Sequence, residues 1–273
     1  MPQYPTVSKV SYSSKSQYEW CPRQYRYDRV DRVKPDFPPR ISTIVGKAIH
    51  ALINRMYRDE NFSLDYLLGL WSECFYYHIK EDGFKFPNKQ TETRWLNIGE
   101  EIIRKFHAMA QERGMLVKPL KTEWRGNLIV TAKSGRQYKI NFVIDLLIQV
   151  GDEIWLPDFK SGSFRLSQPE IDESDQLTIY SMGIRRVLGI TEDKLGFFYL
   201  RYGTVVWTSR PRTEEDFEKL IESIDATWTK IEAKQFEPTY DRCHLCPFSR
   251  RCSAEDLAKK SGLHFDWLYG EPK

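Results

Sequence analysis

The chain has 273 residues with 41% apolar content, which is enough for one large domain or two small ones. Lysine and arginine together number 41 and aspartate and glutamate 38, so the net charge of +3 neither favours nor excludes a nucleic-acid partner. No apolar run approaches the length of a membrane span, and residues 1–10 lack the apolar core of a signal peptide. We therefore expect a soluble, cytoplasmic protein without a membrane partner.

The first 115 residues have the spacing of helices. Ser13 or Ser14 can cap a first helix, and a proline-rich break follows it at residues 34–40. Beyond the break, apolar residues recur every three or four positions, which is the pattern of one buried helix face. Longer helices are predicted at residues 41–58, 63–80 and 90–112.

Strands are predicted from Lys118 onward. Apolar residues alternate from Tyr138 to Val150, which is the pattern of a half-buried strand, and Gly151 with Asp152 fits a two-residue hairpin turn. Further strands are predicted at residues 121–131, 153–160, 195–201 and 204–209, and further helices at 170–189 and 213–234. This order of elements is typical of an α/β or α+β domain with a helical N-terminal portion.

Three charged residues on the two central strands carry the sharpest chemical signal. Asp145 lies in mid-strand, and Asp158 and Lys160 share one face of the next strand because they are two residues apart. Pairing of these strands would bring the two aspartates together, and adjacent carboxylates need a cation such as Mg²⁺ or Mn²⁺. Lys160 could then orient or deprotonate a water, or stabilise charge on a phosphate. The alternative is a structural ion pair between Asp158 and Lys160.

Two helical pairs add to this pattern. Gly46 and His50 are four residues apart, so the imidazole lies over a bare turn with room to approach a metal. Gln176 and Tyr180 likewise share a face of their helix and could reach the strands. Taken alone, each pair is better explained otherwise, as a surface histidine and as the polar edge of an amphipathic helix.

The four motifs occur in the order G-x-x-x-H (46–50), D (145), D-x-K (158–160) and Q-x-x-x-Y (176–180). This order and spacing resemble the RecB-like branch of the PD-(D/E)XK nuclease superfamily. The resemblance spans residues 11–252 and implies an α/β fold with a restriction-endonuclease-like core, in which helices flank a central mixed sheet. It also implies metal-dependent cleavage of DNA phosphodiester bonds.

The resemblance further implies a role for each matching residue. The implied metal ligands are His50, Asp145, Asp158 and the backbone carbonyl of Phe159. The implied catalytic set is Asp145, Asp158, Lys160, Gln176 and Tyr180. The family usually has a glycine three residues before the first aspartate, where this chain has Phe142, and Glu123 on the preceding strand is interpreted as structural.

Three of the five cysteines lie within ten residues, as Cys243-x2-Cys246-x5-Cys252, which suggests metal binding rather than packing. Three thiolates are one short of a tetrahedral zinc site or a cubane cluster. Cys21, which lies 222 positions before Cys243, is one candidate for the fourth ligand. The other is His244, which would make a zinc site.

The cysteine pattern also resembles the iron–sulfur members of the same nuclease branch, which include CRISPR-associated RecB-like exonucleases and AddB-type nuclease domains. This resemblance implies that Cys21, Cys243, Cys246 and Cys252 hold a [4Fe–4S] cluster that joins the two ends of the chain, with Zn²⁺ as the alternative. A clamp on so long a loop would couple cluster assembly to folding. The fifth cysteine, Cys74, is expected to be part of the core.

Arginines recur every three residues after the first cysteine. A helix with Arg23, Arg26 and Arg29 would present a basic stripe to a phosphate backbone. Tyr25 and Tyr27 lie between these arginines and could stack on bases. The alternative is a solvated helix face.

We expect one nuclease domain over residues 1–273. Its N-terminal cluster and DNA segment, helical portion, nuclease core and C-terminal cysteine segment are predicted at residues 11–40, 41–115, 118–235 and 236–260. The expected activity is a Mg²⁺- or Mn²⁺-dependent exonuclease on single-stranded DNA or DNA ends, in repair, recombination or a CRISPR-type pathway. The alternative is a non-catalytic DNA-binding or adaptor subunit of a helicase–nuclease or CRISPR adaptation complex. The chain has no G-x-x-x-x-G-K-[ST] motif, so any unwinding would come from a partner.

Overall fold

The computed structural model describes residues 7–240 and 243–261, with no account of the side chains of residues 254 and 257–261. The chain divides into two compact units. The first unit holds the described residues up to Tyr12 together with Pro39–Ser223, and the second holds Ser13–Pro38 with the described residues from Ile224 onward. The sequence predicts one domain, and joint function of the two units as that domain stays a prediction.

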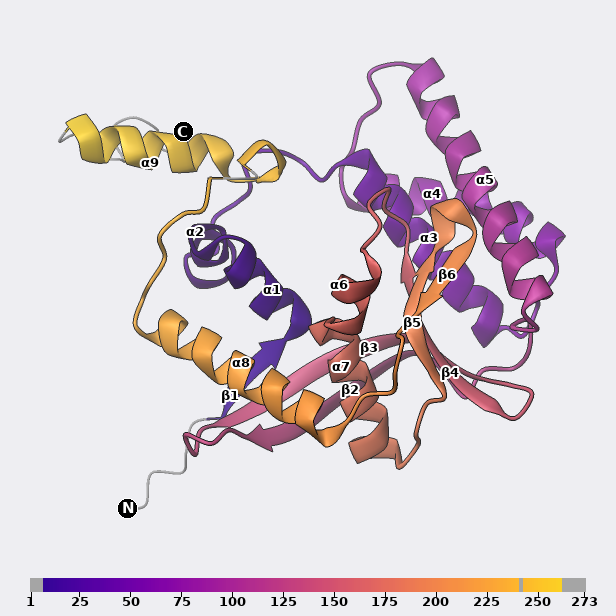
Figure 1. Ribbon diagram of the computed structural model, residues 1–273. Helices are drawn as coiled ribbons and strands as arrows, with labels where there is room; N and C mark the ends of the chain where they lie inside the picture. Colours follow the sequence, from indigo (N-terminus) through magenta and orange to yellow (C-terminus); the bar gives the residue numbers. More distant parts are fainter. Residues whose placement is uncertain (1–6, 241–242, 262–273) are drawn as a thin grey trace. The chain divides into compact units, whose positions relative to one another are not determined.

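A mixed sheet forms the centre of the first unit (Figure 1). Its order is β1-β3-β4-β5-β6, and β2 pairs with β3 as well. Strands β1 and β3 are parallel, as are β4 and β5, whereas the other pairs are antiparallel. The strands are β1 (Ser8–Ser11), β2 (Lys121–Thr131), β3 (Gln137–Val150), β4 (Glu153–Lys160), β5 (Lys194–Tyr199) and β6 (Thr204–Trp207).

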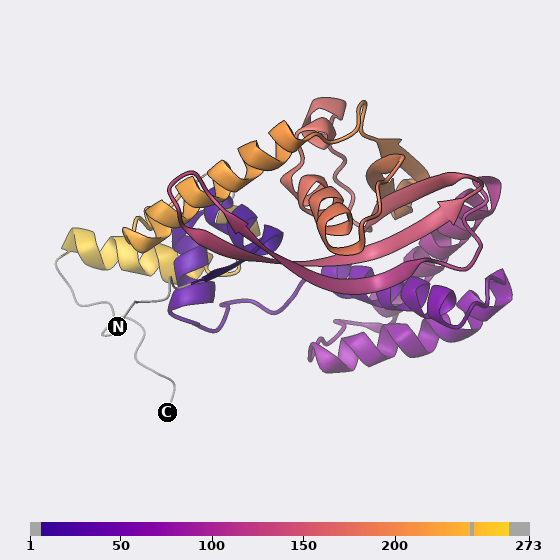
Figure 2. The same cartoon turned by 90° about the horizontal axis from the view of Figure 1, so that it is seen from below.

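Helices cover both faces of this sheet (Figure 2). Helices α3 (Ile41–Arg58), α4 (Leu64–Glu81) and α5 (Lys89–Glu112) bury apolar side chains against Leu146, Ile148 and other residues of the strands. The opposite face carries α6 (Gln168–Asp172) and α7 (Asp175–Gly183). The prediction of a mixed sheet flanked by helices is therefore confirmed. Within the described residues, no helix is long and apolar enough to cross a membrane.

Most predicted elements are present, but the helix at Ser249–Ser261 was not predicted, and two other elements differ. The helix predicted at residues 170–189 is broken into α6, α7 and the π-helical turn Ile184–Leu188. The break occurs because the side chain of Ser174 accepts a hydrogen bond from the backbone N–H of Leu177 and starts a new helix. Strand β1 was not predicted, because its four residues are too few to show an alternating apolar pattern. It pairs in parallel with β3.

Two glycines on neighbouring helices allow a direct test of the α4–α5 packing. A methyl group at Gly99 of α5 would overlap the buried indole of Trp71 on α4, whereas one at Gly69 of α4 would meet nothing within 4 Å. We expect Gly99→Ala to lower the free energy of unfolding by about 1–3 kcal/mol. Gly69→Ala should raise it by up to about 1 kcal/mol, since alanine favours the helix. Urea unfolding of both variants measures this, and shifts of the same sign would contradict the described packing.

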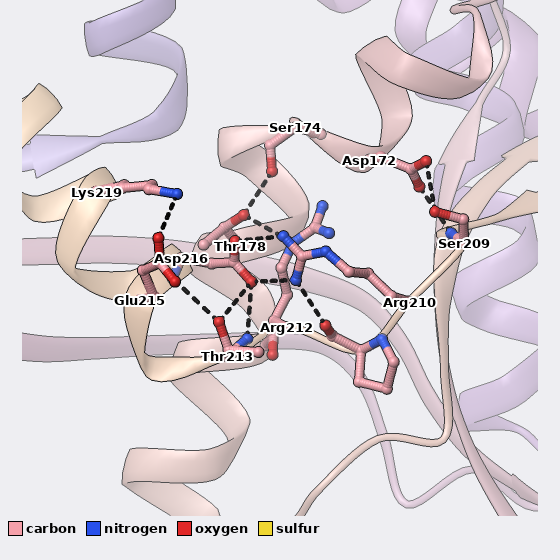
Figure 3. Close-up of polar contacts among 12 residues, drawn as sticks. Asp172, Ser174, Thr178, Ser209, Arg210, Arg212, Thr213, Glu215, Asp216 and Lys219 are labelled. Atoms are coloured by element: carbon pink, nitrogen blue, oxygen red, sulfur yellow. Dashed lines mark hydrogen bonds and ion pairs between the residues drawn. The ribbon is translucent and has the colours of Figure 1, made fainter.

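The N-terminus of α8 (Glu214–Glu232) is held by a polar network in the first unit (Figure 3). Thr213 and Asp216 form a reciprocal cap, because the Thr213 N–H donates to Asp216 Oδ2 at 2.8 Å and the Asp216 N–H donates to Thr213 Oγ1 at 3.4 Å. Arg210 donates to both oxygens of Asp216 at 2.7 Å. These hydrogen bonds, that of Arg210 first, hold the pKa of Asp216 well below its ordinary value.

The lowered pKa gives this cap a defined pH dependence. A carboxylate whose pKa is lower in the folded chain stabilises it above the unfolded pKa of about 4, and this contribution is lost as the pH falls toward the folded value. We expect Asp216→Asn to cost about 1 kcal/mol at pH 7, because Arg210 is half exposed and the pair is partly screened. The difference from wild type should shrink when urea unfolding is repeated at pH 3. A difference that stays constant between the two pH values would contradict this assignment.

The second unit is built from short helices around aromatic side chains. It contains α1 (Tyr12–Trp20) from Ser13 onward, α2 (Pro22–Tyr25), the π-helical turn Arg26–Val30, the C-terminal part of α8, the 3-10 turn Cys243–Leu245 and α9 (Ser249–Ser261). The Tyr18 hydroxyl donates to the Gln235 carbonyl at 2.6 Å, and the ring of Tyr25 stacks on Phe236 with 6.5 Å between centroids. Residues from both ends of the chain thus form this unit.

Candidate active site

Strands β3 and β4 bring the two predicted aspartates together. Their antiparallel pairing runs from Val150 opposite Glu153 to Ile148 opposite Trp155, and continuing this register sets Asp145 opposite Asp158. The strands separate beyond the last pair, and the Asp145 Oδ2 accepts a hydrogen bond from the backbone N–H of Phe159 at 2.8 Å. The two carboxylates therefore lie at one point where the sheet opens.

Lys160 and Gln176 complete the polar contacts of Asp158. The Lys160 Nζ lies 2.7 Å from Asp158 Oδ2 and donates to Gln176 Oε1 at 2.7 Å. The Gln176 Nε2 donates to Asp158 Oδ1 at 2.9 Å and contacts the Tyr180 hydroxyl at 2.8 Å. The glutamine on α7 thus links the aspartate, the lysine and the tyrosine, and it fixes the orientation of Asp158.

Helix α3 presents His50 to the same point. Its Nδ1 lies 3.7 Å from Asp145 Oδ1, and its ring lies edge-on to Phe159 with 6.0 Å between centroids. The helix can approach the end of β4 because it has no side chain at Gly46, where a methyl group would overlap Ser161 Oγ. The structure thus brings together all the side chains of the predicted metal and catalytic sets, whereas ligation by the Phe159 carbonyl stays a prediction.

The site is charged, and its side chains range from buried to partly exposed. The side chain of Asp158 is only 3% exposed, and burial raises its pKa, an effect that the charge of Asp145 adds to and that of Lys160 opposes. Burial by itself would lower the pKa of Lys160, but the charge and hydrogen bond of Asp158, with the charges of Tyr12 and Asp145, together outweigh burial and raise it overall. For His50 too, burial by itself would lower the pKa, but the hydrogen bond and charge of Asp145 together with the charge of Asp158 raise it overall.

Several contacts of the site were not predicted from the sequence. The Lys160 ammonium lies over the ring of Phe197, 4.6 Å from its centroid. The hydroxyl of Thr122 joins Asn54 on α3 to the backbone carbonyl of Asp145, at 2.8 and 3.3 Å. In the parallel register of β4 and β5, Asp158 pairs with Phe197. The contact of Lys160 with Phe197 could therefore have been predicted only if that register had been known.

Phe142 stands where the family usually has glycine, and its surroundings explain how the chain accommodates it. A methyl group at either Gly126 or Gly183 would lie 2.5 Å from the Phe142 ring, so the ring fills space that two neighbouring glycines leave free. It also lies edge-on to Trp124 at 5.5 Å. Glu123 is exposed and has a φ of 41°, an uncommon conformation for a residue with a side chain.

The described part of the chain contains no ready-made group of three His, Cys, Asp or Glu side chains arranged to hold a metal ion. The aspartate pair nevertheless has the chemistry of a cation site. Asp158 Oδ2 is buried beside Lys160 but has no hydrogen bond of acceptable geometry among the described residues, and Asp145 adds a second carboxylate. These oxygens fit Mg²⁺ or Mn²⁺, which would satisfy the buried oxygen and neutralise the pair.

Four cysteines line one cavity in the second unit. All four thiols are free and partly buried. The pKa of Cys246 is raised, first by burial and also by the negative charges of the other three sulfurs, and Arg23 Nη1 donates to Cys252 Sγ at 3.6 Å. The cavity is lined by Trp20, Cys21, Arg23, Gln24, Tyr27, Thr239, Cys243, Cys246, Ser249 and Cys252. Cys21 therefore joins the C-terminal three, whereas His244 is exposed and does not line the cavity.

The predicted DNA-binding stripe needs correction. Tyr25 and Tyr27 are 8% and 3% exposed, so their faces are not available to bases. Arg23 is 3% exposed and pairs with Asp256 of α9. Its guanidinium also contacts Cys252 at the cysteine cavity, so it does not face the surface. Arg26 and Arg29 are partly exposed but already contact acidic residues, so phosphate binding by these two stays a prediction.

Comparison with known proteins identifies the family to which the chain belongs. Residues 9–253 match the family model of the PD-(D/E)XK nuclease superfamily, and the chain belongs to this superfamily. It is 23% identical to the gene 69 protein of Mycobacterium phage D29, over 89% of this chain and 95% of the phage protein. A solved structure described as that of SSO0001 aligns with 91% of this chain and 87% of its own, at 14% identity and a TM-score of 0.41.

Membership of the superfamily defines the class of protein. The chain carries a nuclease domain, whose substrate class is DNA, and nucleases of this superfamily generally use Mg²⁺ or Mn²⁺. The prediction of a PD-(D/E)XK nuclease is thus confirmed at the level of the superfamily. The family match reaches only the superfamily. The more specific predictions, of a RecB-like branch, an iron–sulfur cluster and exonuclease action, therefore stay predictions.

Proposed function

We propose that the chain is a RecB-like deoxyribonuclease that hydrolyses phosphodiester bonds with Mg²⁺ or Mn²⁺. The observation that carries this proposal is the contact set of Asp145, Asp158 and Lys160 at the point where β3 and β4 separate. A buried carboxylate and a second, partly buried one beside a lysine are costly in a protein without a function for them. Their arrangement matches the chemistry that phosphodiester hydrolysis needs.

Each residue of the site has a proposed role. Asp145, Asp158, His50 and the carbonyl of Phe159 would hold the ion, which when bound neutralises the scissile phosphate and activates water. Lys160, at 2.7 Å from Asp158, would orient the attacking water and stabilise the charge that develops on the phosphate. Gln176 would position Lys160 and Asp158 through hydrogen bonds to both, and Tyr180 would fix Gln176 in turn.

We further propose that the four cysteines hold a [4Fe–4S] cluster. Support comes from the single cavity that all four line and from the mutual effect of their charges on the pKa of Cys246. The Arg23 guanidinium, buried beside Cys252, would offset part of the negative charge that four thiolates carry. Zn²⁺ bound by the same four cysteines is the alternative, because sulfur ligands suit both.

The substrate is proposed to be single-stranded DNA or a DNA end, cut by exonuclease action. A non-catalytic DNA-binding or adaptor subunit of a helicase–nuclease or CRISPR-type complex is the alternative function. The described active site favours the enzyme, because an adaptor has no use for a buried aspartate beside a second carboxylate, whose charges must be neutralised. Roles in repair, recombination or spacer acquisition would then follow from a partner.

Digestion of end-labelled DNA separates the two functions. We expect wild-type protein to degrade labelled single-stranded DNA when Mn²⁺ or Mg²⁺ is present and to leave it intact in EDTA. Blunt duplex, circular single-stranded and 5′- or 3′-labelled substrates report whether an end is needed and from which end digestion proceeds. DNA binding without cleavage in either metal would favour the adaptor instead.

A further inference from the structure

An exposed aromatic ring follows directly after the active-site strand. Strand β4 ends at Lys160, and Phe164, four residues later, is 71% exposed. An extended chain of four residues spans at most about 14 Å, which is the length of about four nucleotides of a B-form strand. The ring is therefore within reach of nucleotides that flank a phosphate bound at Lys160.

The loop that carries Phe164 is tied down on both sides of the ring. The Tyr202 hydroxyl donates to the Ser163 carbonyl at 2.7 Å, and the Leu166 N–H donates to the Tyr199 hydroxyl at 3.1 Å. Two tyrosines from β5 and the turn after it thus fix the backbone on each side of the exposed ring. A ring on a fixed loop can stack with little loss of conformational entropy, unlike one on a mobile tip.

The next residue supplies a positive charge. The Arg165 guanidinium lies over the rings of Tyr202 and Tyr199, 5.3 and 5.7 Å from their centroids. Apart from these two ring contacts, the Arg165 side chain has no hydrogen bond or ion pair with the described residues, so its N–H groups stay available to a phosphate. An aromatic ring beside a basic group is the combination by which proteins bind single strands, since every base has a face to stack and every nucleotide a phosphate.

We propose that Phe164 stacks on a base of single-stranded DNA within about four nucleotides of the scissile phosphate and that Arg165 binds a neighbouring phosphate. The inference rests on the proposed nuclease function and specifies its substrate as unpaired DNA. A protein partner is less well matched, because docking surfaces are contiguous apolar patches and Phe164 lies between Ser163 and Arg165.

Binding without cleavage tests this proposal. Anisotropy of a labelled 12-nucleotide single strand in EDTA should give a dissociation constant about tenfold higher for Phe164→Ala than for wild type, and an unchanged one for Phe164→Trp. Arg165→Ala should lower the slope of log affinity against log salt by about 1. Tyr77→Ala is the matched control, because Tyr77 is an aromatic of 62% exposure on α4 of the same unit, and it should bind as wild type does.

Abasic strands identify the stacked base. If one base is removed at each position in turn, the tenfold effect of Phe164→Ala should disappear at one position, because the ring has lost its partner there. Binding by Phe164→Ala equal to that by Tyr77→Ala overturns the proposal, as does a loss that persists with every abasic strand. The second result would mean that the ring contacts the strand without stacking on one particular base.

The outcome for stacking is separable from that for cleavage. Wild-type protein that digests DNA in Mn²⁺ while Phe164→Ala binds normally supports the nuclease and overturns the stacking. Wild-type protein that binds through Phe164 but digests nothing supports the stacking and overturns the nuclease. Melting temperatures of all variants should match wild type, since each replaced side chain is exposed.

Discussion

Lys160→Ala is expected to slow Mn²⁺-dependent cleavage of single-stranded DNA by roughly 10²–10⁴-fold. The Lys160 ammonium is the cationic side chain in contact with both Asp158 and Gln176, and the proposed reaction uses it to orient water and to stabilise phosphate charge. Single-turnover cleavage at saturating protein measures the effect, because it separates chemistry from binding and product release.

Lys194 offers a closely matched control for this experiment. It lies at the start of the neighbouring strand β5, pairs with Glu153 at 2.8 Å and lies over the ring of Trp155 at 4.7 Å. Lys160 has the same kinds of contact, with Asp158 and with Phe197 at 4.6 Å. We expect Lys194→Ala to cleave at the wild-type rate. A Lys160→Ala variant that stays within a few-fold of Lys194→Ala would contradict a catalytic role.

Cys21→Ser is expected to remove the cluster and to destabilise the second unit. Anaerobically purified wild type should be brown, with broad absorption near roughly 400 nm, and the variant should lose both colour and iron. A covalent closure of the 222-position loop between Cys21 and Cys243 would stabilise the fold by about 5 kcal/mol in the chain-entropy model, so a loss of several kcal/mol is expected.

Cys74→Ser is the control for the cluster. Cys74 lies on α4 in the first unit, packs against the apolar core of that unit and does not line the cysteine cavity. This variant should keep the colour and the iron of wild type. Wild-type protein that is colourless and carries stoichiometric zinc would contradict the cluster but leave the nuclease proposal intact.

The elements of the active site could be predicted because their signals are local. Alternation of apolar residues determines where β3 lies, and Gly151, with a φ of 61°, accounts for the turn into β4. Asp145 and Asp158 then follow from hairpin geometry, since antiparallel strands of known turn have a known register. The approach of His50 follows from the helical spacing to Gly46.

Contacts between distant segments could not be predicted in this way. The stripe of arginines after Cys21 resembles a DNA-binding face, yet Arg23 and Tyr27 are turned toward Asp256 and Glu255 of α9. Their partners lie more than 220 residues away, and no periodicity in a single sequence encodes such a pairing. For the same reason the parallel pairing of β4 with β5, which sets Phe197 beneath Lys160, had no sequence signal.

The most direct test of the central claim is Mn²⁺ binding, measured by calorimetry on wild type, Asp158→Asn and Lys160→Ala without DNA. If Asp145 and Asp158 form a metal centre, wild type should bind Mn²⁺, and Asp158→Asn should lose it. Lys160→Ala should bind at least as tightly as wild type, because the ammonium at 2.7 Å competes with the ion for Asp158. Equal binding by wild type and Asp158→Asn, or none by wild type, would mean that Asp158 and Lys160 form only a structural ion pair.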